Sequence, residues 1–250
     1  MLSRAKSGHP GGSLSMADIM AVLYFDVMDH DPADPDNPQK DIFHLSKGHG
    51  CPCWYAALIE SGYIERKHAD HLRQLGGLLQ GHPDPKIPGV HCSSGSLGQG
   101  LSVAVGMALA SRLDGYANRI YCIMGDGELQ EGSIWESVMS AAQFKLDNLC
   151  AVVDANCLQI DGRVKDIMNV EPIDKKFEAF GWHAMRCDGH DVEALCAAFE
   201  KAKMIKGMPT VIVADTVKGK GISFMEHNLG FHGVAPNDQE TKQALEELEN

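Results

Sequence analysis

The stretch from 125 to 162 constrains the fold of this chain more than any other part of the sequence. One apolar run lies just before it, at 120–124, and a second at 149–153, and each predicts a buried strand. Apolar residues recur at helical spacing between the two runs: Ile134, Val138, Met139, Ala142 and Leu146. A strand–helix–strand unit is typical of an α/β fold. We expect a doubly wound, mostly parallel sheet with helices on both faces.

Two polar residues follow these strands directly, Asp126 after the first and Asn156 after the second. Ligands of open parallel sheets bind at the carboxyl ends of the strands. A carboxylate and an amide oxygen are hard ligands suited to Mg²⁺ or Ca²⁺. Gly127, at the start of the predicted helix, can bring its N–H close to a phosphate. The pattern predicts a metal-bridged diphosphate site; the alternative is that Asp126 only caps the helix.

Six short blocks extend this interpretation to almost the whole chain. They are SGHPGG at 7–12, LSKGHG at 45–50, GHP at 81–83, GSLGQG at 95–100, GDGELQEG at 125–132 and FHG at 231–233. Together, and in this order, they resemble the N-terminal, diphosphate-binding half of the transketolase family. The resemblance implies thiamine diphosphate and Mg²⁺ (or Ca²⁺) as cofactors. It also implies transfer of a two-carbon ketol unit from a ketose to an aldose.

The resemblance also assigns residues to the cofactor. The implied metal ligands are the side chains of Asp126 and Asn156 and the backbone carbonyl of Leu158. The implied cofactor-binding residues are His49, Gly95, Ser96, Leu97, Gly127, Asn156 and His232. The chain departs from the usual family pattern at Ser96, where proline is common, and at Cys157, where a polar or basic residue is common.

Three histidines in glycine-flanked loops, His9, His82 and His232, would face the sugar according to the same resemblance. Ketol transfer needs protons moved near neutral pH, where imidazole titrates. Glu131 would lie at a subunit contact beside the partner's activating glutamate. We expect it more than one turn into the helix that starts after Gly127. The alternatives are structural loop histidines and a solvated carboxylate.

We expect residues 1–250 to form a single diphosphate-binding domain, with the pyrimidine-binding and C-terminal domains absent from this chain. A C-terminal transketolase subunit would then be the partner, in a dimer of heterodimers acting on sugar phosphates. A subunit of another thiamine enzyme, similar to 1-deoxyxylulose-5-phosphate synthase or a 2-oxoacid dehydrogenase, is one alternative. A cofactor-binding assembly subunit with no activity alone is another.

Composition limits the partners and the compartment. The net charge of −12 with neutral histidines opposes binding to nucleic acid or to an anionic membrane, both of which require basic patches. No apolar stretch is long enough to span a membrane, and the N-terminus lacks the apolar core of a signal peptide. Eight cysteines in such a chain are expected to be reduced, which predicts a cytoplasmic protein.

Two other sites can be weighed from the sequence. A zinc site would use His49, Cys51, Cys53 and the pair at 91–92, but the C-x-C spacing is tighter than usual and no second pair follows. A dinucleotide site at GSLGQG lacks both a clear preceding strand and a suitably placed acidic residue.

Hydrophobic periodicity predicts the remaining elements. The expected helices span residues 16–28, 68–75, 97–113 and 192–204. A further helix is expected to begin with residues 54–60, and an acidic one to end the chain at 244–250. The expected further strands are 183–187 and 210–215, and the expected loops are 29–38, 78–90 and 219–237.

Overall fold

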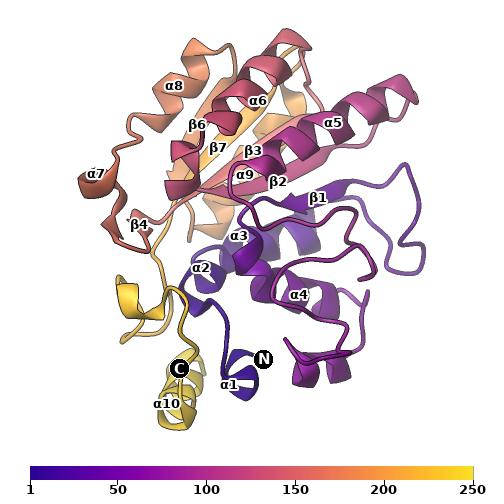
Figure 1. The fold of residues 1–250 in the computed structure, drawn as a ribbon. Helices are drawn as coiled ribbons and strands as arrows, with labels where there is room; N and C mark the ends of the chain where they lie inside the picture. The colour runs from indigo at the N-terminus through magenta and orange to yellow at the C-terminus, as the bar shows by residue number, and fades with distance from the viewer. Residues whose placement is uncertain (250) are drawn as a thin grey trace.

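Five parallel strands form the central sheet, in the order β1-β2-β3-β7-β6 (Figure 1). In this computed structural model, which describes residues 1–249, the strands are β1 (Ile42–Leu45), β2 (Ile120–Gly125), β3 (Leu149–Ala155), β6 (His183–Asp188) and β7 (Thr210–Asp215). A short antiparallel hairpin, β4 (Leu158–Gln159) and β5 (Gly162–Arg163), follows β3. The predicted parallel sheet is confirmed.

Helices cover both faces of this sheet (Figure 1). One face carries α2 (Pro10–Leu14), α3 (Ala17–Val22), the π-helical turn η1 (Leu23–Val27), α4 (Cys51–Glu60) and α9 (Val192–Met204). The other carries α5 (Gln99–Leu113), α6 (Gly132–Gln143) and α8 (Ile173–Ala179). The doubly wound arrangement is therefore confirmed.

Short elements complete the chain. They are α1 (Leu2–Ala5), η2 (Gly48–Gly50), η3 (Arg66–His71), η4 (Gly127–Gln130), α7 (Val164–Ile167), η5 (Leu229–Phe231) and α10 (Asp238–Leu248). The last helix begins earlier than predicted, because Asn237 caps it and forms a capping box with Glu240. The chain termini lie at the same end of the molecule (Figure 1).

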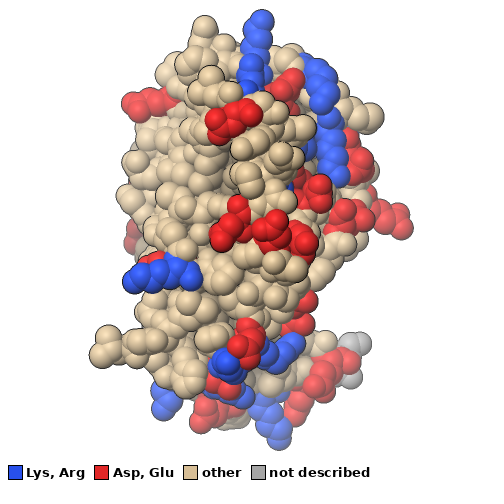
Figure 2. All heavy atoms as spheres, turned by 90° about the vertical axis from the view of Figure 1, so that its right-hand side faces the viewer, with Lys and Arg blue, Asp and Glu red and all other residues tan. Residues whose placement is uncertain are grey.

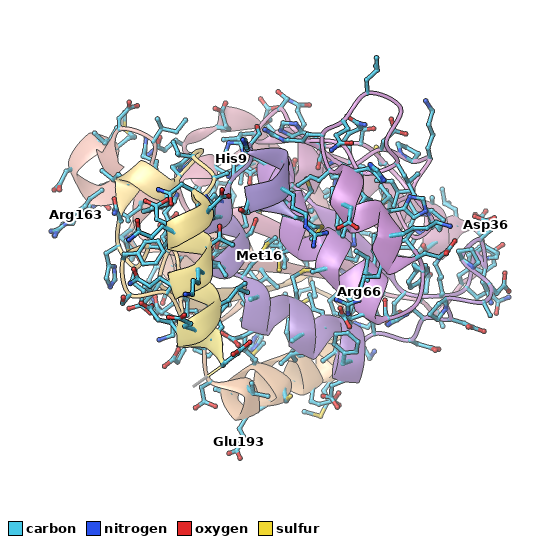
Figure 3. The ribbon with its side chains drawn as sticks, turned by 90° about the horizontal axis from the view of Figure 1, so that it is seen from below. His9, Met16, Asp36, Arg66, Arg163 and Glu193 are labelled. Atoms are coloured by element: carbon cyan, nitrogen blue, oxygen red, sulfur yellow. The ribbon has the colours of Figure 1, made fainter. Side chains whose placement is uncertain are left out.

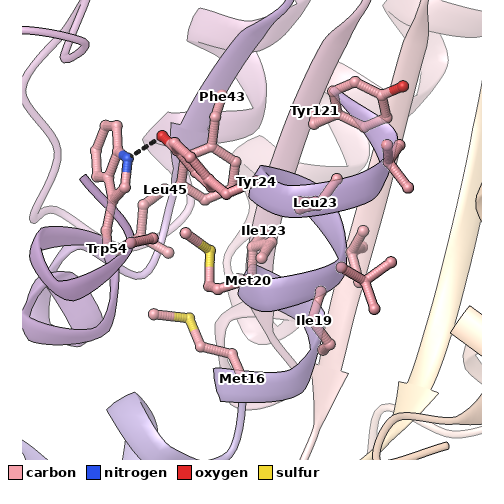
Figure 4. Close-up of a cluster of buried hydrophobic side chains, with 14 of the residues drawn as sticks. Met16, Ile19, Met20, Leu23, Tyr24, Phe43, Leu45, Trp54, Tyr121 and Ile123 are labelled. Atoms are coloured by element: carbon pink, nitrogen blue, oxygen red, sulfur yellow. Dashed lines mark hydrogen bonds between the residues drawn. The ribbon is translucent and has the colours of Figure 1, made fainter. Parts of the chain in front are cut away.

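The strands are continuous apolar runs because both of their faces are covered. Every residue of β3 is buried, including the charged Asp154 at its carboxyl end. On the α3 face, Trp54 donates its indole N–H to the hydroxyl of Tyr24, and the Trp54 ring packs edge-on against Phe43 (Figure 4). A buried tryptophan thus keeps a hydrogen-bond partner for its N–H group.

One prediction about local structure is wrong, and one strand of the sheet was not predicted. The predicted helix at 68–75 is instead the 3-10 turn η3 followed by a loop, because Arg73 (φ 59°) and Gly76 (φ 79°) have left-handed backbones that end the helical path. Strand β1 was not predicted, because it is only four residues long and contains His44. The loop at 78–90 is irregular as expected, yet Leu79, Ile87 and Val90 in it are buried.

The surface carries charges of both signs. On the face in Figure 2, Asp and Glu side chains form several groups, and Lys and Arg side chains lie scattered among them. The eight cysteines all have free thiols. Within residues 1–249, no helix has the length and apolar character needed to cross a membrane.

Candidate functional site

A cavity of about 410 Å³ lies at the carboxyl ends of β2 and β3. Its lining residues are His9, Gly12, Lys47, His49, His82, Gly95, Leu97, Gly125, Asp126, Gly127, Glu128, Gln130, Glu131, Asn156, Leu158, Gln159, Ile160, Asp161, Lys218 and His232. Residues from all six sequence blocks thus meet at one place, at the edge of the sheet where ligands of this fold class bind.

Asp126 is a buried carboxylate with no ion-pair partner among residues 1–249. Its Oδ1 accepts the N–H of Gly127 at 2.9 Å, and its Oδ2 accepts the N–H of Cys157 at 2.7 Å. Burial, and then the nearby charge of Asp154, raise the pKa of Asp126 to about 6, although the two hydrogen bonds oppose the shift. A buried carboxylate without a counter-charge suits the approach of a cation.

Two further oxygen atoms lie on the loop after β3. Oδ1 of Asn156 accepts the backbone N–H of Leu158 at 3.1 Å. The carbonyl oxygen of Leu158 accepts Nζ of Lys218 at 3.0 Å. Burial, and then the charge of Lys47, lower the pKa of Lys218 to about 8. The carbonyl of Leu158 thus already accepts a hydrogen bond from a buried ammonium group.

A buried ion pair lies beneath the loop that follows β3. Lys47 forms it with Asp154, and both side chains are almost completely inaccessible. The Asp154 carboxylate also accepts the hydroxyls of Ser15, at 2.6 Å, and Thr216. Burial opposes ionisation of Asp154, but Lys47 and these hydrogen bonds outweigh it and lower its pKa. Asp154 therefore joins the ends of β1, β3 and β7 through a single ionised group.

A second buried carboxylate, Glu128, joins three segments that line the cavity. It accepts the hydroxyl of Ser46, the N–H of Gly98 at 2.8 Å and the N–H of Gly125 at 3.1 Å. These donors lie at the end of β1, at the N-cap of α5 and at the end of β2. Glu128 thus fixes the position of the GSLGQG turn relative to the sheet.

Three histidine rings pack together in the cavity. Ring centroids lie 5.1 Å apart for His9 and His49, 5.7 Å for His9 and His232, and 5.5 Å for His49 and His232. Burial and nearby positive charges lower the pKa of His49 to about 2 and that of His232 to about 4. Burial also lowers the pKa of His9, and the charge of Arg73 adds to this effect. These rings are neutral at pH 7.

Comparison with known proteins agrees with this geometry. The sequence profile described as "Transketolase, thiamine diphosphate binding domain" matches residues 1–249. The chain belongs to the transketolase family. The predicted family and its thiamine diphosphate are therefore confirmed.

Some relatives of this transketolase chain are about as long as it is, and others are more than twice as long. It is 46% identical over 243 residues to the "6-deoxy-6-sulfo-D-fructose transketolase subunit SqwG" of Clostridium sp. (strain MSTE9), covering 97% of this chain and 88% of that protein. It is 44% identical over 244 residues to an apulose-4-phosphate transketolase subunit of Actinobacillus succinogenes, with the same coverages. It is 43% identical over 245 residues to human transketolase, covering 98% of this chain and 39% of that protein.

A solved structure gives the same picture. The crystal structure of transketolase from Campylobacter jejuni superposes with a TM-score of 0.95 at 35% identity, covering 99% of this chain and 40% of that one. The chain spans about 40% of this solved transketolase and most of the length of the subunit relatives. It thus corresponds to the thiamine diphosphate-binding, N-terminal part of a transketolase.

The residues of the transketolase chain fit the metal and diphosphate that its family implies. The donor set that the resemblance implies, the Asp126 carboxylate, the Asn156 amide oxygen and the Leu158 carbonyl, consists of hard ligands of the kind that Mg²⁺ and Ca²⁺ prefer. Within residues 1–249, no group of three or more His, Cys, Asp or Glu side chains is placed to hold a metal. The zinc alternative therefore has no support, because its histidines and cysteines do not converge.

Gly127 lines the cavity, but the structure corrects the expected helix that starts after it and the expected position of Glu131 inside that helix. Gly127 donates its N–H to Asp126, and η4, which it begins, is only a four-residue 3-10 turn, so the expected helix dipole is not formed there. Glu131 is extended (φ −76°, ψ 130°) and is the N-cap of α6, not a residue inside a helix. Its exposed side chain lines the cavity.

The GSLGQG turn and the GHP loop contribute unequally to the cavity. Gly95 and Leu97 line it, whereas Ser96 lines a separate 250 Å³ hollow. His82 lies against Gly95, where an added Cβ would be 3.0 Å from Cδ2 of the imidazole. The predicted sugar-side histidines His9, His82 and His232 all line the cavity.

Sequence reasoning missed several residues of the site. Lys47, Glu128 and Lys218 line the cavity, and Asp154 lies beneath it. A charged residue at the end of an otherwise apolar strand, as at Asp154, is a signal that could have been used, because such a residue requires a buried partner. The position of Lys218 carries no comparable signal.

Proposed function

We propose that this chain binds thiamine diphosphate with Mg²⁺ (or Ca²⁺) and acts together with a second chain that carries the pyrimidine-binding domain. The complex would transfer a two-carbon ketol unit from a ketose to an aldose. One observation carries the proposal: a single cavity combines the unpaired, buried carboxylate of Asp126 with the histidines His9, His49, His82 and His232.

The residues at the sheet edge would hold the diphosphate end of the cofactor. Asp126, Asn156 and the carbonyl of Leu158 would coordinate the cation, and Lys218 supplies a second positive charge beside them. Thiamine diphosphate itself supplies the carbanion chemistry when it is bound. The protein contributes orientation and charge stabilisation through groups that the fold has already placed.

The histidines would act on the sugar. His9, His82 and His232 line the same cavity, and their lowered pKa values keep their rings neutral at pH 7. A neutral imidazole can accept a proton at one nitrogen and donate one from the other. Such groups can hold hydroxyls of the sugar and move protons as its carbonyl forms and breaks.

The names of relatives support a two-chain enzyme. Two of them are described as transketolase subunits, and this chain covers 88% of each. Their names specify an apulose phosphate and a sulfonated deoxyfructose, so we propose a sugar with an anionic end as the substrate. A dimer of heterodimers and a cytoplasmic location are parts of the same proposal and rest on the sequence features that predicted them.

Reconstitution tests this function. The chain is purified alone and together with the product of a neighbouring reading frame that resembles the pyrimidine-binding half. Ketol transfer from xylulose 5-phosphate to ribose 5-phosphate, and from other anionic sugars, is then measured with and without Mg²⁺. We expect turnover only from the pair, with the partner chain alone as the control. Robust turnover by the pure chain would contradict the two-chain proposal, and an inactive pair that binds the cofactor would favour an assembly role without activity.

A further inference from the structure

Arg73 has an unusual backbone and a conspicuous position in the loop that precedes His82. Its φ of 59° lies in the left-handed region, which non-glycine residues rarely adopt. Its N–H donates to the carbonyl of Leu79 at 2.8 Å, which closes the loop between the two residues. The backbone at Arg73 is therefore held in a less favourable conformation by the loop around it.

The guanidinium of Arg73 connects two segments that carry histidines of the cavity. It lies against Gly81, where an added Cβ would be 2.7 Å from both Nε and Nη2 of the arginine. Its Nη1 donates to the hydroxyl of Ser7 at 2.6 Å. Gly81 directly precedes His82, and Ser7 lies two residues before His9. One planar group thus contacts the chain beside each of these histidines.

The far side of the GHP loop is held separately. The hydroxyl oxygen of Tyr55, on α4, lies 3.0 Å from the carbonyl oxygen of Gln80 and 2.9 Å from that of His82, and its single proton is shared between them. The loop is therefore fixed from α4 on one side and by Arg73 on the other. The hydrogen bond from Arg73 to Ser7 links the segment before His9 to this loop, and the ion pair of Arg4 with Asp70 joins the two regions further from the cavity.

The positive charge of Arg73 is not neutralised by an ion pair within residues 1–249. The charged and titratable groups that face His9 are Arg73, His82 and Lys218, together with the rings of His49 and His232. Arg73 is the charged group that acts on His82. Burial lowers the pKa of both histidines, and the Arg73 charge lowers each further.

We propose that Arg73 is a positioning residue, which holds His9 and His82 at a fixed separation by connecting Ser7 to Gly81. This inference rests on the proposed function, in which both histidines face the sugar. Its second consequence is electrostatic. A positive charge next to both rings disfavours their protonated forms, so both remain proton acceptors under conditions where an ordinary histidine begins to be charged.

Histidine titrations of the whole chain test the inference without measuring turnover. The imidazole signals are followed by NMR, and those of His9 and His82 are assigned from His9→Gln and His82→Gln. Arg73→Gln should move both midpoints upward by about half a pH unit or more, whereas Arg73→Lys should keep them near their original values. Arg66→Gln is the matched control, since Arg66 forms an ion pair with Glu60 and is far from His9 (Figure 3).

Turnover by the reconstituted pair tests the positioning role. Arg73→Gln should lower kcat by about 10- to 100-fold. It should also move the acid limb of the pH profile to higher pH, because histidines with raised pKa values are protonated sooner. Ser7→Ala removes the hydroxyl that accepts the Arg73 hydrogen bond but keeps the positive charge of Arg73. It should therefore lower kcat and leave the titration midpoints of His9 and His82 unchanged.

The titrations and the turnover measurements separate failure of this inference from failure of the proposed function. A folded Arg73→Gln chain with unchanged midpoints for both histidines overturns the inference. If that variant does not fold, unchanged turnover in both Arg73→Lys and Ser7→Ala overturns it instead. A wild-type pair without ketol transfer contradicts the proposed function, and the titrations then still decide whether Arg73 acts on the two histidines.

Discussion

Asp154 orients the side-chain amide of Asn156. Nδ2 of Asn156 donates to Oδ2 of Asp154 at 3.0 Å, while Oδ1 accepts the N–H of Leu158. A reversed amide would place its NH₂ against the Leu158 N–H and its oxygen against a buried carboxylate, and both contacts are repulsive. The oxygen of Asn156 is therefore held toward the backbone of Leu158, the segment that would supply a further metal ligand in the proposed site.

Asp126→Ala is expected to remove most of the metal dependence of cofactor binding. Loss of an outer group that orients a ligand already costs about 10- to 100-fold in metal affinity, and loss of a charged ligand should cost at least as much. Calorimetric titration with thiamine diphosphate, with and without Mg²⁺, measures this on the reconstituted pair. Asp114→Ala, at the exposed end of α5, is the control. Unchanged affinity in Asp126→Ala would show that the metal binds elsewhere.

Lys47→Met is expected to destabilise the fold strongly. It leaves the fully buried Asp154 without its counter-charge, a change that typically costs about 3–5 kcal/mol. The free energy of unfolding from urea denaturation at pH 7 measures the loss. Lys67→Met is the matched control, because the pair of Lys67 with Glu65 is exposed to solvent and its loss should leave the stability unchanged. A small loss for Lys47→Met would mean that water reaches Asp154.

His44 should make the fold less stable in mild acid. The residue is buried in β1 with both ring nitrogens unpartnered among residues 1–249, and burial lowers its pKa from 6.5 to about 4. Because the unfolded chain binds this proton more readily, stability is lost as the pH falls from about 6.5 towards 4. At about 1.4 kcal/mol per pKa unit, the loss approaches about 3 kcal/mol.

The test for His44 compares urea denaturation at pH 7 and pH 4.5. His44→Leu should lose about 2 kcal/mol less than the wild type between these values, because it cannot take up the proton. His71→Leu, at an exposed position on η3, is the control and should behave as the wild type. Equal losses for His44→Leu and the wild type would place the acid-sensitive groups elsewhere.

Glu131→Gln is expected to weaken assembly or cofactor activation while leaving the fold intact. Its side chain is exposed at the start of α6 and lines the cavity, so a partner's carboxylate could share a proton with it there. Analytical ultracentrifugation and turnover of the reconstituted pair measure the two effects. Glu193→Gln is the control, since Glu193 also lies at the start of a helix, but on the opposite face of the sheet. Wild-type assembly and turnover in Glu131→Gln would make Glu131 a surface residue.

The sequence alone determined the α/β class, the strands β2, β3, β6 and β7, and the family. Buried parallel strands require uninterrupted apolar runs, and such runs are visible without a structure. The resemblance of the six blocks to the transketolase family also implied that their loops meet at one site, and ligands of parallel sheets bind at the carboxyl ends of the strands. Asp126 and Asn156 could be placed in this way because each directly follows a strand.

The tertiary structure alone decided which buried charges hold the site together. Lys47 and Asp154 are separated by 107 residues, and Ser46 and Glu128 by 82, so no local pattern can pair them. The position of Glu131 likewise depends on a 3-10 turn and one extended residue between β2 and α6. Hydrophobic periodicity reports which face of a single helix or strand is buried. An ion pair or a hydrogen bond between two elements depends on where those elements meet in space, and only the packed sheet decides that.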